Sequence, residues 1–178
     1  MASTAKANIS DADNTLSALT LIGDGESFKE ELCRMLESAQ MFTEFTRPEI
    51  LQLASFARAY SVDKGVTIFK EGQKGSFMCI IIEGRVDIFK QSDTRENKRI
   101  TTVRPGKSMG EMSILDELPH SATTIATEDT KLVMITKHNF DKLTEKHPEL
   151  GLKVLRKIAK LLSLRLRQTT GILLDYLE

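Results

Sequence analysis

The sequence has little cysteine, no long apolar run and no net charge, and each of these features excludes a class of protein. Its two cysteines, Cys33 and Cys79, show no CxxC or Cys/His ligand spacing, so two half-buried thiols in a reducing cytoplasm are predicted. No apolar run approaches the roughly 18 residues that cross a bilayer, so no membrane span is predicted. No apolar segment follows a basic start, so no secretory signal is predicted either. The 25 basic and 25 acidic residues cancel, which disfavours a general nucleic-acid binder.

Sequence signatures of catalysis are also absent. The three histidines, His120, His138 and His147, do not lie at metal-ligand spacing with carboxylates. There is no GxSxG, P-loop or HExxH motif. None of the predicted strands contains a histidine that could hold a metal inside a barrel. We therefore predict a protein that is not an enzyme and that holds no metal or other cofactor.

The pattern of apolar residues predicts helices, then short strands, then helices. Residues 1–26 are mostly small and polar, which is typical of a flexible tail or a weakly attached helix. Helical spacing begins at Ser27 and returns at Lys137, and from Pro148 onward the chain has the pattern of one long amphipathic helix. The strand formers in between lie at roughly ten-residue spacing with glycine turns, which predicts a compact antiparallel sandwich or barrel. The predicted strands lie at 62–69, 77–82, 85–90, 100–103, 123–127 and 132–135.

The turn glycines of the strand region follow a definite order. They are Lys64-Gly65, Glu71-Gly72, Gly75, Glu83-Gly84-Arg85-Val86, Pro105-Gly106 and Gly110-Glu111-Met112-Ser113. In this order and spacing they resemble a cyclic nucleotide-binding domain, of the type found as the effector domain of catabolite-activator proteins. The resemblance covers about 42–145. No single piece is specific, but the whole series is.

The resemblance implies a fold of mostly β structure with flanking helices. We expect an eight-stranded antiparallel jelly-roll β-roll at about 61–136, an N-terminal helical bundle and C-terminal helices. The expected domain covers 27–147 and the C-terminal amphipathic helix covers 148–178. The helix-turn-helix of the family's transcription factors has no counterpart after this helix, so a stand-alone, bacterial-type domain that does not bind DNA is expected.

The resemblance also implies where a ligand binds. In the family the ligand lies against a loop and short helix called the phosphate-binding cassette, here 108–123. Gly110 would let the backbone approach the ligand. Glu111 would accept a hydrogen bond from the ribose 2′-hydroxyl, because an ionised acceptor strengthens such a bond. Hydroxyls and an N–H would come from Ser121-Ala122-Thr123. The expected ligand-binding residues are Met109, Gly110, Glu111, Met112, Ser113, His120, Ser121, Ala122 and Thr123.

His120 departs from the family pattern, in which this position is usually arginine. Arginine offers a charged, two-pronged donor to a phosphate, whereas histidine is mostly neutral at pH 7. Three interpretations stay open. A bound anion could protonate His120, or another cation such as Lys107, Arg85 or Arg104 could reach the phosphate. Alternatively, the pocket is degenerate and His120 is an ordinary surface histidine. Glu111 likewise has a plainer interpretation, as a residue that only braces the loop.

The C-terminal helix carries a second signal. Six cations and no acidic residue lie between Lys153 and Arg167, and the apolar positions show a short, imperfect heptad pattern through Leu155 and Leu162. Three interpretations fit this pattern: packing against the roll, a dimer seam, and a helix for a membrane surface or an acidic partner.

The function that these observations predict is regulatory. The protein is expected to be a cytoplasmic sensor of cAMP or cGMP whose C-terminal helices respond to the ligand, with affinity weakened because His120 replaces arginine. The expected partners are the cyclic nucleotide, an effector protein and a second copy bound through 148–178. The alternative is a ligand-free fold that acts as a dimerisation or protein-interaction module.

Overall fold

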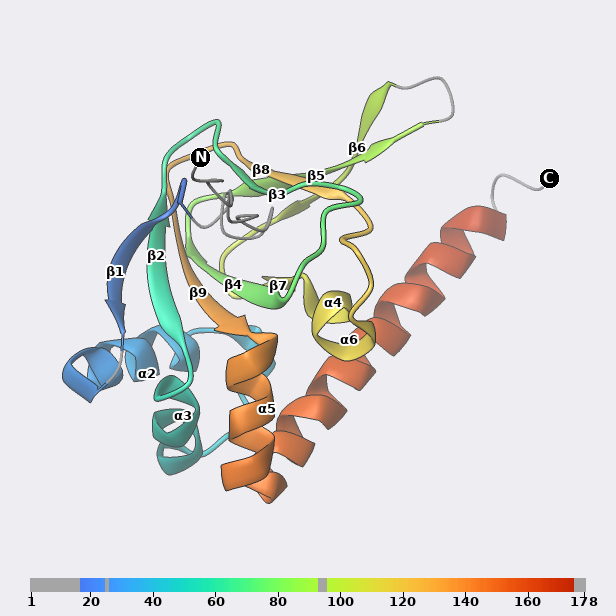
Figure 1. The fold of residues 1–178 in the computed structure, drawn as a ribbon. Helices are drawn as coiled ribbons and strands as arrows, with labels where there is room; N and C mark the ends of the chain where they lie inside the picture. Colours follow the sequence, from blue (N-terminus) through green and yellow to red (C-terminus); the bar gives the residue numbers. More distant parts are fainter. Residues whose placement is uncertain (1–16, 25, 93–95, 175–178) are drawn as a thin grey trace, which may run out of the picture.

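The computed structural model describes residues 17–24, 26–92 and 96–174, and the strands of this part form two antiparallel sheets (Figure 1). The larger sheet has the order β1-β2-β9-β4-β7, with bounds Thr20–Asp24, Arg58–Val62, Thr130–Thr136, Phe77–Glu83 and Ser108–Met109. The smaller sheet has the order β3-β8-β5-β6, with bounds Thr67–Phe69, Thr123–Ala126, Val86–Gln91 and Asn97–Val103. The predicted β-roll with flanking helices is confirmed, with nine strands in the described residues where eight were expected.

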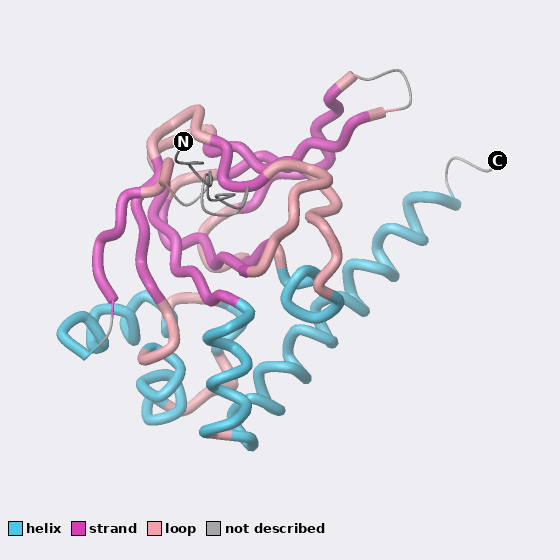
Figure 2. The backbone as a smooth tube through the Cα atoms, viewed as in Figure 1, coloured by secondary structure: helices cyan, strands magenta, loops and turns pink. Residues whose placement is uncertain are grey.

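Helices precede, interrupt and follow the roll (Figure 2). Short 3-10 turns at Glu26–Phe28 and Gln40–Phe42 accompany the helices α2 and α3, which span Lys29–Glu37 and Arg47–Ala54. The helix α4, Glu111–Asp116, lies between β7 and β8, and α5 and α6 follow at Lys137–Lys146 and Pro148–Leu174. In the described part of the chain, no helix is both long enough and apolar enough to cross a membrane.

The strand β4 lies between two apolar clusters, which explains why its sequence is apolar without alternation. Met78 and Ile80 pack against the helices, while Cys79 and Ile81 face the space between the two sheets. Both faces of β4 are therefore buried, as they are in its neighbour β9, and a strand buried on both sides reads as a continuous apolar run. The apolar core on the side of the helices and the apolar core between the two sheets therefore meet at β4 and β9.

The helix α6 packs on the apolar core mainly through its first half. Leu150, Val154 and Ile158 are buried, and Lys153 Nζ lies 2.8 Å from the Glu49 carboxylate and 4.6 Å from the centre of the Phe45 ring. Figure 1 shows α6 running past α4 and then projecting away from the roll. The leucines of α6 from Leu164 onward are accordingly exposed, with Leu166 at 68%.

One correction concerns the expected flexible tail at 1–26. Thr20–Asp24 form the edge strand β1, which pairs antiparallel with β2, and Leu19 beside it is buried. The small and polar residues hid this strand, because its stability comes from pairing with β2 and not from its own composition. The rest of the predicted tail up to residue 16 lies outside the described residues.

Candidate functional site

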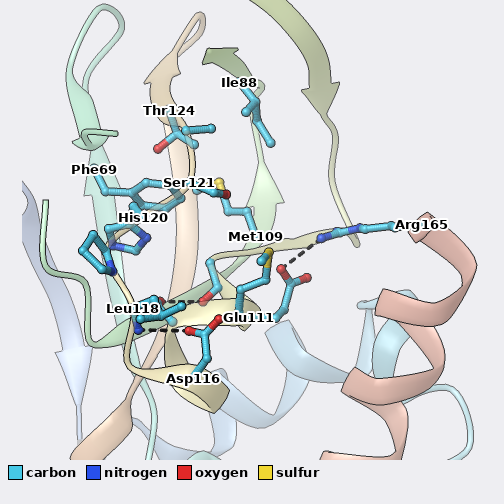
Figure 3. Close-up of a pocket in the computed structure, with 15 residues that line it drawn as sticks. Phe69, Ile88, Met109, Glu111, Asp116, Leu118, His120, Ser121, Thr124 and Arg165 are labelled. Atoms are coloured by element: carbon cyan, nitrogen blue, oxygen red, sulfur yellow. Dashed lines mark hydrogen bonds and ion pairs between the residues drawn. The ribbon is translucent and has the colours of Figure 1, made fainter. Parts of the chain in front are cut away.

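A cavity of about 220 Å³ opens between β7, α4 and the start of β8 (Figure 3). It is built where the sequence analysis expected the phosphate-binding cassette. Its lining is Phe69, Ile88, Met109, Gly110, Glu111, Met112, Ser113, Asp116, Leu118, Pro119, His120, Ser121, Ala122, Thr124 and Arg165. Eight of the nine expected ligand-binding residues are in this set, and Thr123 is the exception.

Gly110 is required by the backbone at the start of α4. Its φ is +80°, in the left-handed region that side chains rarely adopt. A Cβ at this position would lie 2.8 Å from the Phe77 carbonyl oxygen of β4, which is closer than a Cβ atom approaches such an oxygen. Gly110 therefore lets the chain turn tightly from β7 into α4, and this turn brings Glu111 to the cavity wall.

Glu111 is a buried carboxylate, with 2% of the residue exposed. The Ser108 hydroxyl donates a hydrogen bond to Oε1, and Arg165 Nη1 donates to Oε2 at 3.0 Å. A buried carboxylate needs such partners because an unpaired charge away from water is costly. The contact with Ser108 agrees with the plainer interpretation of Glu111 as a residue that braces the loop. The contact with Arg165 also links Glu111 to α6.

Arg165 is the charged residue from outside the cassette that the sequence did not place at this site. It extends from α6 to Glu111 (Figure 3), and its Nη2 also donates to the Ser108 carbonyl oxygen at 2.6 Å. The sequence does hold one sign that Arg165 faces the domain. Arg165 lies seven residues after Ile158 and so shares a helix face with it. Ile158 is buried against the domain, so this face points inward. The sequence alone did not show how far along α6 the contact with the roll extends.

His120 is enclosed by aromatic rings. It stacks on Phe69, with the ring centroids 3.9 Å apart and an interplanar angle of 12°, and meets Phe77 edge-on at 5.6 Å. The residue is 5% exposed, so the interpretation of His120 as a surface histidine is wrong. Burial lowers the pKa of His120 to about 4, so the ring is neutral near pH 7.

His120 Nε2 is buried and, within the described residues, has no hydrogen-bond partner. A Cβ on Gly75 would lie 1.8 Å from this nitrogen, so the ring rests directly against the Gly75 backbone. The glycine that the sequence analysis placed in the turn series thus provides the space for His120. The side chain fills a fixed slot between Phe69, Phe77 and the loop that precedes β4.

In the segment after His120, some polar groups bind neighbouring segments and others face the cavity. Thr123 Oγ1 accepts a hydrogen bond from the Glu71 N–H at 3.0 Å, and the Ser121 carbonyl oxygen accepts one from Lys90 Nζ at 2.7 Å. Thr124 faces inward instead, with its hydroxyl buried and unpaired within the described residues. Because side chains alternate along a strand, β8 can turn only one of its two adjacent threonines to the cavity.

The charges around the cavity are mostly negative. Glu111 and Asp116 supply two carboxylates, and Arg165 is the one lysine or arginine among the described residues of the lining. The cations that the sequence analysis considered do not line the cavity. Lys107 donates to Gln40 and Arg85 lies 3.4 Å from Glu128, while Arg104 is absent from the lining.

Comparisons with known proteins agree with this geometry. A family model described as "Cyclic nucleotide-binding domain" matches residues 60–147. This range runs from β2 to the start of α6 and so contains every cavity residue except Arg165. In the described part of the chain, no cluster of three or more His, Cys, Asp or Glu residues is arranged to hold a metal ion.

Two curated relatives share the domain but are longer proteins. A cyclic AMP receptor protein from Thermus thermophilus is 31% identical over 122 residues, which are 68% of this chain and 55% of that protein. The lysophospholipase NTE1 of Kluyveromyces lactis is 25% identical over 127 residues, which are 70% of this chain and 9% of that protein. The chain thus spans about half of the first relative and a small part of the second.

A solved structure matches over nearly the full length. The crystal structure of a cyclic nucleotide-binding domain from Methylobacillus flagellatus superposes with a TM-score of 0.78 and 26% identity, and the match covers 90% of each chain. The family model, the relatives and the shared fold agree with the turn glycines and with the cavity that they shape. The chain contains a cyclic nucleotide-binding domain.

Proposed function

We propose that the protein is a regulatory module that binds cAMP or cGMP in the cavity and responds through α6. The observation that carries this proposal is the ion pair between Arg165 and Glu111. It joins the helix that follows the domain to the carboxylate that the family resemblance assigns to the ribose 2′-hydroxyl. A ligand that reaches Glu111 must therefore compete with α6.

The response follows from this competition. When a ribose hydroxyl donates to Glu111, the contact between Arg165 and Glu111 is lost or rearranged, and the balance between docked and undocked arrangements of the second half of α6 shifts. A ligand shifts such a balance only by the difference between its affinities for the two arrangements. The first half stays docked in both, because Val154 and Ile158 are fully buried.

The module acts through binding and carries out no catalysis of its own. Its proposed location is the cytoplasm, and its proposed effector is a protein that recognises one arrangement of α6. A second copy of the chain is a further proposed partner, since an exposed or half-exposed stripe along α6 repeats with alternating spacings of four and three. The stripe consists of Leu155, Ala159, Leu162, Leu166, Thr169 and Leu173.

The second candidate function is a ligand-free interaction module. The observation that favours it is His120, which is neutral and enclosed by Phe69 and Phe77 where a charged donor to phosphate is expected. In this case the roll serves as a scaffold for α6 and its apolar stripe.

Titration calorimetry with cAMP and cGMP separates the two functions, using the wild type and His120→Arg. The sensor predicts saturable heat from the wild type. His120→Arg should bind about tenfold tighter or more, because a charged donor to phosphate is worth about 2 kcal/mol or more. No heat from either protein at millimolar nucleotide would overturn the sensor and leave the interaction module.

A further inference from the structure

The phosphate-binding cassette supplies no cation for the phosphate of a cyclic nucleotide. His120 occupies the relevant position, but its ring is held between Phe69 and Phe77 and against Gly75. A ring confined in this way cannot reach out as a long side chain does. Moving it toward a ligand would break the stack on Phe69.

Three cations that could be considered for the phosphate are engaged elsewhere. Lys90 Nζ lies 2.6 Å from the Glu71 carboxylate and donates to the Ser121 carbonyl oxygen, so its charge is balanced within the loop. Lys107 and Arg85 contact Gln40 and Glu128. None of the three lines the cavity.

Arg165 has the position and the chemistry that the cassette lacks. It lines the cavity, and its side chain is 43% exposed, so a ligand can reach it. A guanidinium has five N–H donors in a planar fork that matches two phosphate oxygens. The contacts to Glu111 and to the Ser108 carbonyl oxygen use two of these donors, so others are left for a ligand.

The charge around the cavity means that an anionic ligand needs a contact with Arg165. The lining holds two carboxylates, Glu111 and Asp116, against the single guanidinium of Arg165. A phosphodiester carries one further negative charge, and like charges in a partly buried site repel strongly. With no other cation in the described lining, Arg165 is the group that can offset this repulsion.

We propose that Arg165, contributed by α6, is the residue that binds the phosphate of the cyclic nucleotide, in place of a cation in the cassette. This inference rests on the proposed function. On binding, Arg165 exchanges the carboxylate of Glu111 for the phosphate, and Glu111 accepts the ribose hydroxyl. The ligand's charge then acts directly on α6, so recognition of the phosphate and movement of the helix depend on one side chain.

Matched ligands with and without phosphate test this proposal. Affinities for cAMP and adenosine, and for cGMP and guanosine, are measured by calorimetry with the wild type, Arg165→Gln, Glu111→Gln and the double variant. Arg165→Gln should weaken cyclic nucleotide binding about tenfold or more, the scale expected for a lost charged contact. Nucleoside binding should not weaken, because a nucleoside has no phosphate and no longer competes with Arg165 for Glu111. Arg167→Gln, an exposed cation of α6 outside the cavity lining, is the control and should bind like the wild type.

The Glu111→Gln background separates phosphate binding from simple neutralisation of Glu111. The proposal predicts that Arg165→Gln weakens cyclic nucleotide binding in this background too, because the lost contact is to the phosphate. If Glu111→Gln and the double variant bind cyclic nucleotide equally, Arg165 acts only through Glu111, and the inference is wrong while the proposed function stands. If the wild type and Glu111→Gln both give no heat with cAMP or cGMP at millimolar concentration, the proposed function fails and the inference fails with it.

Discussion

At the scale of single residues, the surroundings of His120 decide its charge. A histidine in water is partly protonated just below neutral pH, whereas the aromatic slot around His120 favours the neutral ring. Its Nε2 has no hydrogen-bond partner among the described residues, so nothing nearby stabilises the protonated form. The same side chain therefore costs stability when the pH falls.

This cost gives a prediction for the pH dependence of stability. Burial lowers the pKa of His120 from 6.5 to about 4, so the unfolded chain binds more protons than the folded protein between these values. The free energy of unfolding should therefore fall as the pH drops from about 6.5 to about 4. Chemical denaturation at several pH values measures this fall, with His120→Asn as the variant that cannot titrate.

Carboxylates also titrate in this range, so the difference between the two proteins is the quantity that decides. His120→Asn should lose less stability than the wild type over the same interval. Parallel curves for the two proteins would mean that His120 titrates alike in the folded and unfolded states, and that the aromatic slot does not hold the ring neutral.

The sequence predicts the residues whose role is local and misses those whose role depends on distant packing. Gly110 and Glu111 were expected at the site from the family resemblance that the local series of turn glycines carries, and both line the cavity. Thr124 was missed in favour of Thr123, since two adjacent threonines do not reveal which one faces inward. Arg165 was missed because its place depends on how α6 crosses the roll, 54 residues after Glu111.

At the scale of elements, the loop between β3 and β4 is joined to the segment that leaves the cassette. Gly72 N–H donates to the His120 carbonyl oxygen, and His120 N–H donates to the Gln73 carbonyl oxygen, both at 2.9 Å. Glu71 N–H adds the contact to Thr123. The sequence predicted a loop here from its glycines, but these pairings between distant segments follow only from the folded arrangement.

Gly75→Ala tests this junction. The added Cβ would meet the His120 ring at 1.8 Å, so the ring or the loop must move. Overpacking of a filled site typically costs about 1–3 kcal/mol, and we expect a loss of unfolding free energy in this range, measured by chemical denaturation. Gly171→Ala is the control, because a Cβ there meets no atom within 4 Å, and it should cause no loss.

A second variant shows whether the loss comes from His120 itself. In a His120→Ala background the ring is gone, so Gly75→Ala should cost much less than it does in the wild type. An equal cost in both backgrounds would mean that the added methyl group disturbs the loop for another reason, and that Gly75 and His120 do not share one space.

At the scale of the whole molecule, Arg165 joins the exposed half of α6 to the roll through its ion pair with Glu111 and its hydrogen bond to the Ser108 carbonyl oxygen. The continuous apolar strands β4 and β9 hold the helices on one side and the interior of the roll on the other. The cavity therefore lies between well-packed sheets on one side and the half-exposed side chain of Arg165 on the other. The apolar pattern predicted a long helix after the roll, whereas the contact from Arg165 of this helix to Glu111 was visible only in the structure.

The central claim is that a cyclic nucleotide in the cavity acts on α6 through Arg165. The most direct measurement is a titration of the full chain with cAMP and with cGMP, followed by NMR at each backbone amide. The account predicts that amides from Ser108 to Thr124 and amides of α6 around Arg165 shift together and saturate at one ligand concentration. Shifts confined to the cassette would contradict the coupling to α6, and the absence of shifts at millimolar nucleotide would contradict ligand binding itself.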